Sequence, residues 1–284
     1  MPEFISKLQH YISEKGEFSN EKVRSLAQTI ELIKTFSWLT ERPFYNNNIT
    51  GPSVTIQDEN HNYLKIGLYP NNMFAVYYND KHFYELHVAE IDDAIKEAKN
   101  FFEGQMDLQK FEKHFFNIGN AAYFKTRDFV YRVKLWKALF SSTTFIIFFV
   151  LPLIMLLELS KTASTADVIV ITLPLLFFGG LLTYVIIRYI ACRNQVIKIS
   201  RGNDEFFFSD DSSEHKYNKN DVEKIMIYQP GGNKKVHWFY VYEVYFADGT
   251  VLKFSNMLIS EAELKNKFPD DYFSYGLKSP FWKL

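Results

Sequence analysis

The chain has 284 residues, one cysteine, and 32 Lys and Arg against 33 Asp and Glu, which gives a net charge of -1 at pH 7. This length allows about two domains, the single cysteine excludes an internal disulfide and most cysteine-based metal sites, and the balanced charge excludes a basic nucleic-acid-binding surface. Residues 1–124 hold 12 Lys and Arg against 17 Asp and Glu, residues 125–189 hold 7 against 3, and residues 190–284 hold 13 against 13. The basic excess therefore lies in the middle of the chain.

Residues 1–124 are predicted to form an α+β domain that begins with two helices, at 3–15 and 19–41. In the second, Val23, Leu26, Ile30 and Ile33 recur at roughly helical spacing, and Pro43 follows the last turn. Short runs of aromatic and branched residues come next and are separated by turn residues, which predicts an antiparallel meander. The predicted strands are 53–57, 62–69, 73–78 and 82–88.

Two further helices are predicted to complete this domain, at 89–103 and 107–116. Asp92 and Asp93 lie in the first turn of the earlier one, where acidic side chains favour the helix dipole, and Gly104 ends it. The meander NYLKIGLYPNNMFAVYYND followed by EIDDAIKEAKNFFEG resembles small α/β immunity proteins that accompany bacterial toxins. The resemblance covers about residues 50–104 and implies a protein partner.

The middle of the chain contains two twenty-residue stretches without a charged side chain, Ala138–Leu157 and Val168–Ile187. At about 1.5 Å of rise per residue, each spans about 30 Å as a helix, which matches the hydrocarbon core of a bilayer. Buried helices of a soluble core are the alternative, but such helices usually carry a polar stripe. Residues 125–192 are therefore predicted to be a basic juxtamembrane segment and a two-helix transmembrane hairpin, with spans at about 136–158 and 167–190.

Charges beside the spans predict the orientation of the hairpin. Basic residues precede the first span and follow the second, whereas the connection 158–167 contains only Lys161. The positive-inside rule places both flanking domains, and so both termini, in the cytoplasm. The residues expected at the membrane interface are Tyr131, Arg132, Lys134, Trp136, Lys137, Arg188, Tyr189 and Arg193.

The N-terminal sequence MPEFISKLQHYISEK lacks the basic and apolar regions of a signal peptide, so the first span is expected to direct insertion. Abundant Phe, Tyr, Lys and Asn suggest an AT-rich bacterial genome. We therefore expect a multi-pass protein of the bacterial cytoplasmic (inner) membrane. Cys192, just beyond the second span, is expected to be a packed or idle thiol, with acylation as the alternative.

Residues 193–284 are predicted to be mostly β. The pair Asp248-Gly249 favours a tight hairpin, and Ser260 and Glu263 form a capping box that opens a helix at 261–267. Many short strands closed by one helix predict a small barrel or sandwich. The predicted strands are 195–200, 205–209, 214–217, 222–229, 238–246 and 251–254.

The strand pair QVIKIS and EFFFSD, the segment KYNKNDVEKIMIY, the hairpin YEVYFADGTVLKF and the closing helix resemble bacterial pleckstrin-homology-like (PH-like) domains. Such domains follow a two-span hairpin in many small bacterial membrane proteins, and the resemblance covers about residues 193–270. It implies a PH-like barrel that acts as an assembly or interaction module. Phosphoinositide-binding relatives place several Lys and Arg on the first hairpin, whereas this one has Arg201 beside Asp204, so headgroup binding is not implied.

No pattern for enzymatic chemistry was found, because the chain lacks phosphate-binding, dinucleotide-binding, nucleophile-elbow and zinc-protease motifs. We therefore expect no catalytic residues, no cofactor and no metal. Neither span carries an ionisable residue near its centre, which disfavours a transporter. The cationic, aromatic tip with Lys234, Lys235 and Trp238 is a candidate contact for a partner or for anionic lipid, against the alternative of a solvated hairpin.

The function predicted from these features is a non-enzymatic, double-pass membrane protein that binds a protein partner. Its concrete form is an immunity protein that neutralises a toxin acting at the membrane. The alternative is a regulatory or scaffolding protein that assembles a membrane complex through its PH-like domain. The expected partners are the lipid bilayer and a protein, with no nucleic acid, and homo-oligomerisation is left open.

Overall fold

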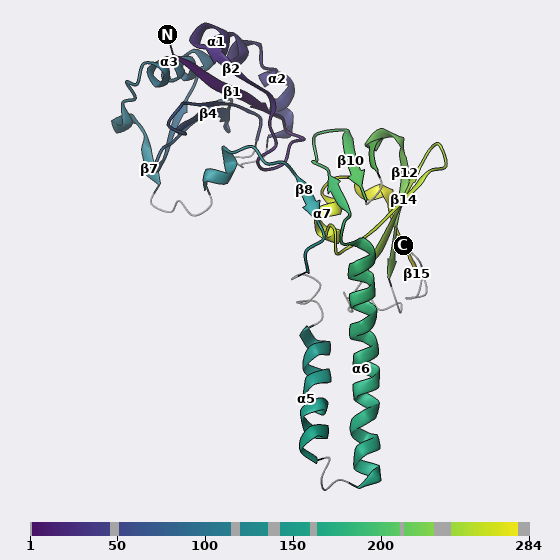
Figure 1. Cartoon of the computed structure of the whole chain (residues 1–284). Coiled ribbons are helices and arrows are strands. Elements are labelled where there is room, and N and C mark those ends of the chain that lie inside the picture. The colour runs from purple at the N-terminus through teal and green to yellow at the C-terminus, as the bar shows by residue number, and fades with distance from the viewer. Residues whose placement is uncertain are drawn as a thin grey trace. The chain divides into compact units, whose positions relative to one another are not determined.

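The computed structural model describes residues 2–45, 51–114, 120–135, 143–159, 164–210, 213–229 and 240–277. The chain folds into two compact units (Figure 1). The first comprises Met1–Asp128 with Ser200–Asn203, and the second comprises Phe129–Ile199 with Asp204–Leu284.

The first unit is built on a seven-stranded antiparallel sheet with the order β2-β1-β3-β4-β5-β6-β7. The predicted meander is confirmed, because β3 to β6 are consecutive antiparallel neighbours. The strands are β1 (Glu3–Gln9), β2 (Ser19–Ser25), β3 (Ser53–Gln57), β4 (Tyr63–Leu68), β5 (Phe74–Asn79), β6 (Phe83–Val88) and β7 (Glu112–His114).

The helices of the first unit cover one face of this sheet. Ile33 of α1 (Leu26–Thr35) and Ala98 of α3 (Ile91–Phe102) are fully buried in one apolar core with alternate strand residues such as Ile56 and Ile66. A short α2 (Trp38–Glu41) follows α1, and Trp38 donates its indole hydrogen bond to the Ile33 carbonyl at 2.8 Å. Single 3-10 turns occur at Arg42–Phe44, Leu108–Lys110 and Asn120–Tyr123.

The helix predicted at 3–15 is wrong, since this segment contributes β1 to the sheet. Its side chains alternate with a period of two: Phe4 and Leu8 pack towards the helices, whereas Lys7 and Gln9 are buried elsewhere. The predicted helix 19–41 begins only at Leu26, because Ser19–Ser25 forms the edge strand β2. Edge strands commonly carry exposed charges that oppose aggregation, and such charges obscure the strand pattern.

The helix predicted at 107–116 is also absent from the described residues there, which form a 3-10 turn and β7. By contrast, Asp92 and Asp93 lie in the first turn of α3 as predicted. Pairing with β6 accounts for the strand, because Glu112–His114 satisfies its backbone groups along the β6 edge.

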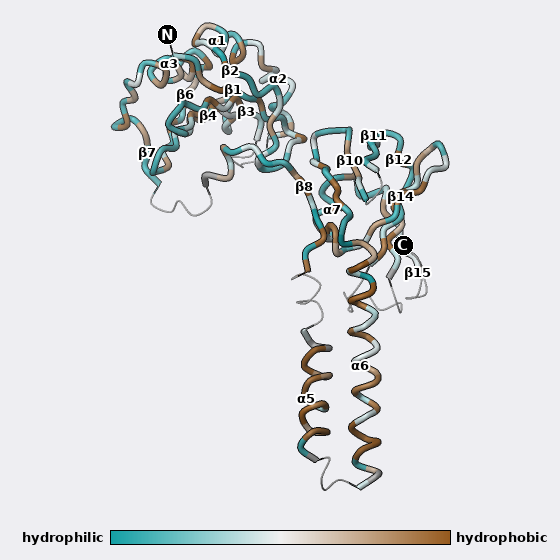
Figure 2. The backbone as a smooth tube through the Cα atoms, viewed as in Figure 1, coloured by the Kyte–Doolittle hydropathy of each residue, from teal (hydrophilic) through white to brown (hydrophobic). Residues whose placement is uncertain are grey.

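The second unit contains two long apolar helices, α5 (Thr143–Leu159) and α6 (Thr165–Cys192), which lie side by side (Figures 1 and 2). Within the described residues, one helix, Ala166–Cys192, is long and apolar enough to cross a membrane, and Ile146–Glu158 is a shorter apolar stretch. Only 11% of the apolar window in the longer helix is buried. The helices therefore present apolar side chains outward, unlike helices of a soluble core.

The rest of the second unit is a pair of four-stranded sheets, with orders β11-β10-β9-β8 and β14-β13-β12-β15. All neighbours are antiparallel except β12 and β15, which are parallel. The strands are β8 (Val130–Arg132), β9 (Val196–Lys198), β10 (Glu205–Ser209), β11 (Glu214–Asn218), β12 (Val222–Gln229), β13 (Val241–Phe246), β14 (Val251–Ser255) and β15 (Phe273–Leu277). Single 3-10 turns occur at Lys219–Asp221 and Asp270–Tyr272.

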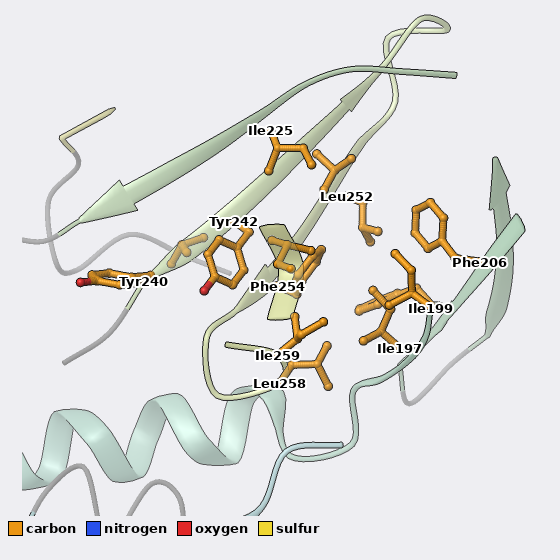
Figure 3. Packing of buried hydrophobic residues seen from close by; sticks show 14 of the residues in the cluster. Ile197, Ile199, Phe206, Ile225, Tyr240, Tyr242, Leu252, Phe254, Leu258 and Ile259 are labelled. Carbon is orange, nitrogen blue, oxygen red and sulfur yellow. The ribbon is translucent and has the colours of Figure 1, made fainter. Parts of the chain in front are cut away.

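One apolar core joins both sheets and the helix α7 (Glu261–Lys265) (Figure 3). Ile197 and Phe206 come from the first sheet, Tyr242 and Phe254 from the second, and all four are at most 1% exposed. Leu264 of α7 is fully buried in the same core. The predicted capping box is confirmed, because the Ser260 and Glu263 side chains cap each other's backbone amides.

Strand β8 changes the domain boundary inferred from sequence. Residues 130–132 lie in the segment predicted to be juxtamembrane, yet they pair with β9 across α5 and α6. The helices are thus inserted between the first two strands of the second unit's β structure. The resemblance assigned the strand pair QVIKIS and EFFFSD to the first hairpin of the domain. Because β8 precedes this pair and pairs with β9, the connection between β9 and β10 is the second in the sheet.

Candidate functional site

The feature most informative about function is the junction between α6 and the β core. Cys192, the last residue of α6, is fully buried, and its sulfur lies 3.8 Å from the Ser255 hydroxyl and 4.0 Å from the Met257 sulfur. Tyr189 and Val185, one and two turns earlier, pack against the same core. The last turns of α6 are therefore part of the domain, and Cys192 is a packed thiol as expected.

Three of the residues predicted at the membrane interface, Tyr131, Arg188 and Tyr189, are buried or partly buried in the second unit, and their place at an interface stays a prediction. The Tyr131 ring in β8 packs against the core and lies 5.3 Å, centroid to ammonium, from Lys267. Arg188 is only 8% exposed, with its guanidinium 5.2 Å from the centroid of the Tyr184 ring. An aromatic or basic residue beside an apolar helix can thus pack against the domain that the helix joins.

The remaining predicted interface residues that the structure describes lie on either side of the helices. Arg132 and Lys134 are exposed on and just after β8, and Arg193 is exposed as the C-cap of α6. β8 pairs directly with β9, so these cations lie where the chain leaves the β structure for α5 and where it returns from α6. Trp136, Lys137, Lys234, Lys235 and Trp238 lie outside the described residues.

A cavity of about 470 Å³ with several polar side chains in its lining lies beside α7 and was not predicted from sequence. Its charged groups bond one another: Lys265 donates to the Tyr275 hydroxyl at 2.7 Å, and Tyr275 donates to Glu261 at 2.6 Å. The hydrogen bond to Tyr275 raises the pKa of Lys265. The cavity is lined by Tyr240, Asn256, Ser260, Glu261, Ala262 and Lys265.

This cavity presents hydrogen-bonding groups whose charges are internally balanced. Such a site is suited to a neutral polar group of a binding partner. Because its one Lys is paired with its one Glu, it has no net positive charge to bind a phosphate headgroup. Sequence reasoning identified Ser260 as a helix cap but missed Tyr275, because β15 pairs with β12 only through the tertiary fold. Among the residues that the structure describes, no three His, Cys, Asp or Glu side chains are grouped to hold a metal ion.

The comparisons with known proteins identify the β structure of the second unit. A PH domain family model matches residues 130–267. The matched range begins at β8 and extends just past α7, so residues 130–267 contain a PH-like domain into which α5 and α6 are inserted. No curated protein and no solved structure matches the chain.

The family match extends the resemblance inferred from sequence, which began at about residue 193. The added segment contains β8, and without it the first sheet would end at β9 with an unpaired edge. The similarity of residues 50–104 to immunity proteins stays a prediction.

Proposed function

We propose that the chain is a non-enzymatic, double-pass membrane protein whose two domains bind a protein partner at the cytoplasmic face of a bacterial inner membrane. The single observation that carries this proposal is the continuity between α6 and the PH-like core, through Val185, Tyr189 and Cys192. A domain built onto its own membrane helix needs no lipid headgroup to bring it to the bilayer. Its exposed surface is therefore available to a partner.

The outward apolar surface of the helices supports the membrane part of the proposal. Leu157 of α5 and Val170, Leu176 and Phe177 of α6 are each more than 60% exposed. The Phe148 and Phe178 rings stack at 5.1 Å between centroids, and a side chain at Gly179 would meet the Phe149 ring at 3.0 Å. Small residues allow such close packing of transmembrane helices.

A toxin acting at the membrane is the most concrete partner, which makes the chain an immunity protein. The first unit supports this form because it is a separate compact fold with an acidic excess of 17 against 12 in residues 1–124. The alternative partner is a membrane complex scaffolded by the PH-like domain. The insertion of the helices into that domain favours this alternative, because it fixes the domain beside neighbouring membrane proteins.

Site-specific photo-crosslinking in native membranes tests the proposal. A photoreactive residue replaces exposed Asp107 of the first unit or exposed Lys216 of β11, and Ile169 on α6 serves as the lipid-facing control. We expect a protein adduct, identified by mass spectrometry, from at least one domain position and not from Ile169. If neither domain position gives a protein adduct, partner binding is wrong.

Deletion of the gene distinguishes the two forms of the proposal. An immunity protein predicts that deletion sensitises cells to a toxin encoded nearby and that the adduct contains this toxin. An adduct with a membrane complex, together with unchanged toxin sensitivity, contradicts the immunity form and supports scaffolding.

A further inference from the structure

The face of the seven-stranded sheet opposite α1 and α3 contains a buried polar row. Lys7 of β1 pairs in register with Thr55 of β3, and Thr55 pairs with Lys65 of β4. Residues directly opposite one another on neighbouring strands point to the same side of the sheet. Two lysines therefore flank one threonine on a face that the helices do not cover.

All three side chains are removed from solvent. Lys7 and Lys65 are 1% exposed and Thr55 is 0% exposed. The two ammonium groups converge on the Phe18 ring, at 4.4 Å for Lys7 and 5.6 Å for Lys65 from its centroid. The long side chains thus bring both charges to one place beside an aromatic wall.

The negative charge around these two cations is insufficient. Lys65 donates to the Gln9 side-chain oxygen at 2.7 Å and to the Tyr123 carbonyl at 3.4 Å, which are both neutral acceptors. Lys7 donates to the Thr126 hydroxyl at 3.0 Å and lies 3.9 Å from the Glu21 carboxylate. In the described part of the chain, one carboxylate therefore faces two buried ammonium groups.

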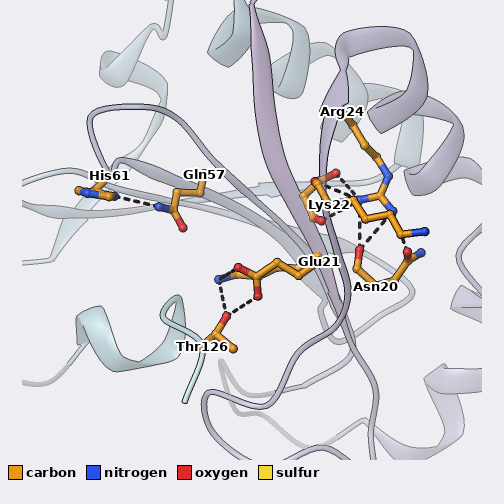
Figure 4. Close-up of polar contacts among 9 residues, drawn as sticks. Asn20, Glu21, Lys22, Arg24, Gln57, His61 and Thr126 are labelled. Carbon is orange, nitrogen blue, oxygen red and sulfur yellow. Dashed lines mark hydrogen bonds and ion pairs between the residues drawn. The ribbon is translucent and has the colours of Figure 1, made fainter. Parts of the chain in front are cut away.

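The Glu21 carboxylate is itself shared with another donor. The Thr126 hydroxyl donates to it at 2.6 Å, and Figure 4 shows Glu21 beside Thr126. Glu21 is 38% exposed, so part of its charge is screened by solvent. A buried cation without a full partner is costly. A bound anion would offset that cost.

The Thr55 hydroxyl supplies an independent observation at the same place. It is buried and has no hydrogen-bond partner within the described residues. Buried hydroxyls are normally satisfied, because leaving one without a partner costs about 1–3 kcal/mol. A ligand oxygen between the two lysines would accept this hydrogen bond.

We propose that Lys7, Thr55 and Lys65 form a binding site for a small oxyanion of the size of inorganic phosphate. Two ammonium groups and one hydroxyl on the same face of the sheet provide donors for phosphate oxygens. Full burial of Lys65 restricts the ligand to a compact ion, and Glu21 and Thr126, which contact the Lys7 ammonium, are exposed to solvent. This site is independent of partner binding at the membrane.

The electrostatics of Lys65 agree with this assignment. Burial, and secondarily the charge of Lys7, lowers the pKa of Lys65 to about 7. A bound oxyanion would stabilise the ammonium form and raise that pKa. The other ionisable groups facing the row are Glu21, Tyr63 and Tyr77, the last being in register with Lys65.

Isothermal titration of the full chain in detergent micelles with inorganic phosphate, at constant ionic strength in chloride, tests the site. We expect millimolar or tighter binding that weakens at least about tenfold in Lys7→Met and Lys65→Met, because each variant removes a charge-assisted hydrogen bond. Lys22→Met is the matched control, since Lys22 lies on the neighbouring strand with an exposed side chain. Its dissociation constant for phosphate should stay within about twofold of that of the unaltered chain.

Thr55→Val provides a second variant that retains both lysines and the side-chain shape. We expect it to weaken phosphate binding about threefold to tenfold through loss of one donor. The site is refuted if the unaltered chain does not bind phosphate, or if Lys65→Met and Lys22→Met bind it equally.

Discussion

The pH dependence of stability in the first unit follows from the buried position of Lys65. Its pKa is lowered from 10.5 to about 7, so between these values the unfolded chain holds a proton that the folded chain releases. The free energy of unfolding should therefore rise as the pH increases from 7 to 10.5. The slope is about 1.4 kcal/mol per pH unit, and the upper bound of the total is about 5 kcal/mol.

Lys65→Met should remove most of this pH dependence while preserving the length of the side chain. Below pH 7, burial of the charged Lys65 side chain costs the unaltered chain up to about 5 kcal/mol, and the variant avoids this cost. The variant also loses two hydrogen bonds worth about 1 kcal/mol each. We therefore expect a net stabilisation of about 3 kcal/mol at pH 6, and a small destabilisation near pH 10. A residual slope should remain, because burial also lowers the pKa of Lys7.

Hydrogen exchange of a peptide that spans β3 and β4 measures this effect in the intact chain. The measurement uses phosphate-free chloride buffer, so that a bound oxyanion does not raise the pKa of Lys65. Lys22→Met is the control and should retain the pH dependence of the unaltered chain. Equal pH slopes in Lys65→Met and in the unaltered chain would refute the reasoning.

Substitutions at four positions in the second unit give further tests by thermal unfolding. Phe254→Ala should cost about 3–5 kcal/mol through a cavity in the core, whereas Leu277→Ala, at a position 70% exposed, should cost less than about 0.5 kcal/mol. Tyr242→Phe should leave stability unchanged or raise it by at most about 3 kcal/mol, because the Tyr242 hydroxyl is buried without a hydrogen-bond partner in the described residues. A large destabilisation would contradict this. Ser260→Ala should cost about 1 kcal/mol by removing the capping box, and Ser260→Asp should restore most of it.

Local patterns were sufficient to predict the elements whose partners are adjacent in sequence. The strands β3 to β6 are short runs rich in aromatic and branched residues and are separated by turn residues, so sequence reasoning predicted their meander. The capping box at Ser260 is equally local. The two apolar stretches can likewise be recognised from their length and their lack of charged residues, without knowledge of the tertiary fold.

Elements that depend on distant partners were missed. β8 has only three residues, and its partner β9 begins 64 residues after it ends, so Val130–Arg132 read as a basic flank of the predicted membrane span. β1 and β2 read as helices because their polar residues obscure the alternation. The lysine pair was missed for the same reason, since the strand pairing that buries Lys7 beside Thr55 is visible only in the fold.

The proposed function requires that one membrane hairpin holds both domains on the cytoplasmic side. Labelling of single cysteines with a membrane-impermeant maleimide tests it in a Cys192→Ala background. The exposed positions are Asp107→Cys in the first unit, Asp248→Cys in the PH-like domain and Ser164→Cys before α6. The account predicts that Ser164→Cys is labelled in intact spheroplasts and that the other two are labelled only after permeabilisation. Labelling of Asp107→Cys or Asp248→Cys in intact spheroplasts, or recovery of the chain in the soluble fraction, would contradict it.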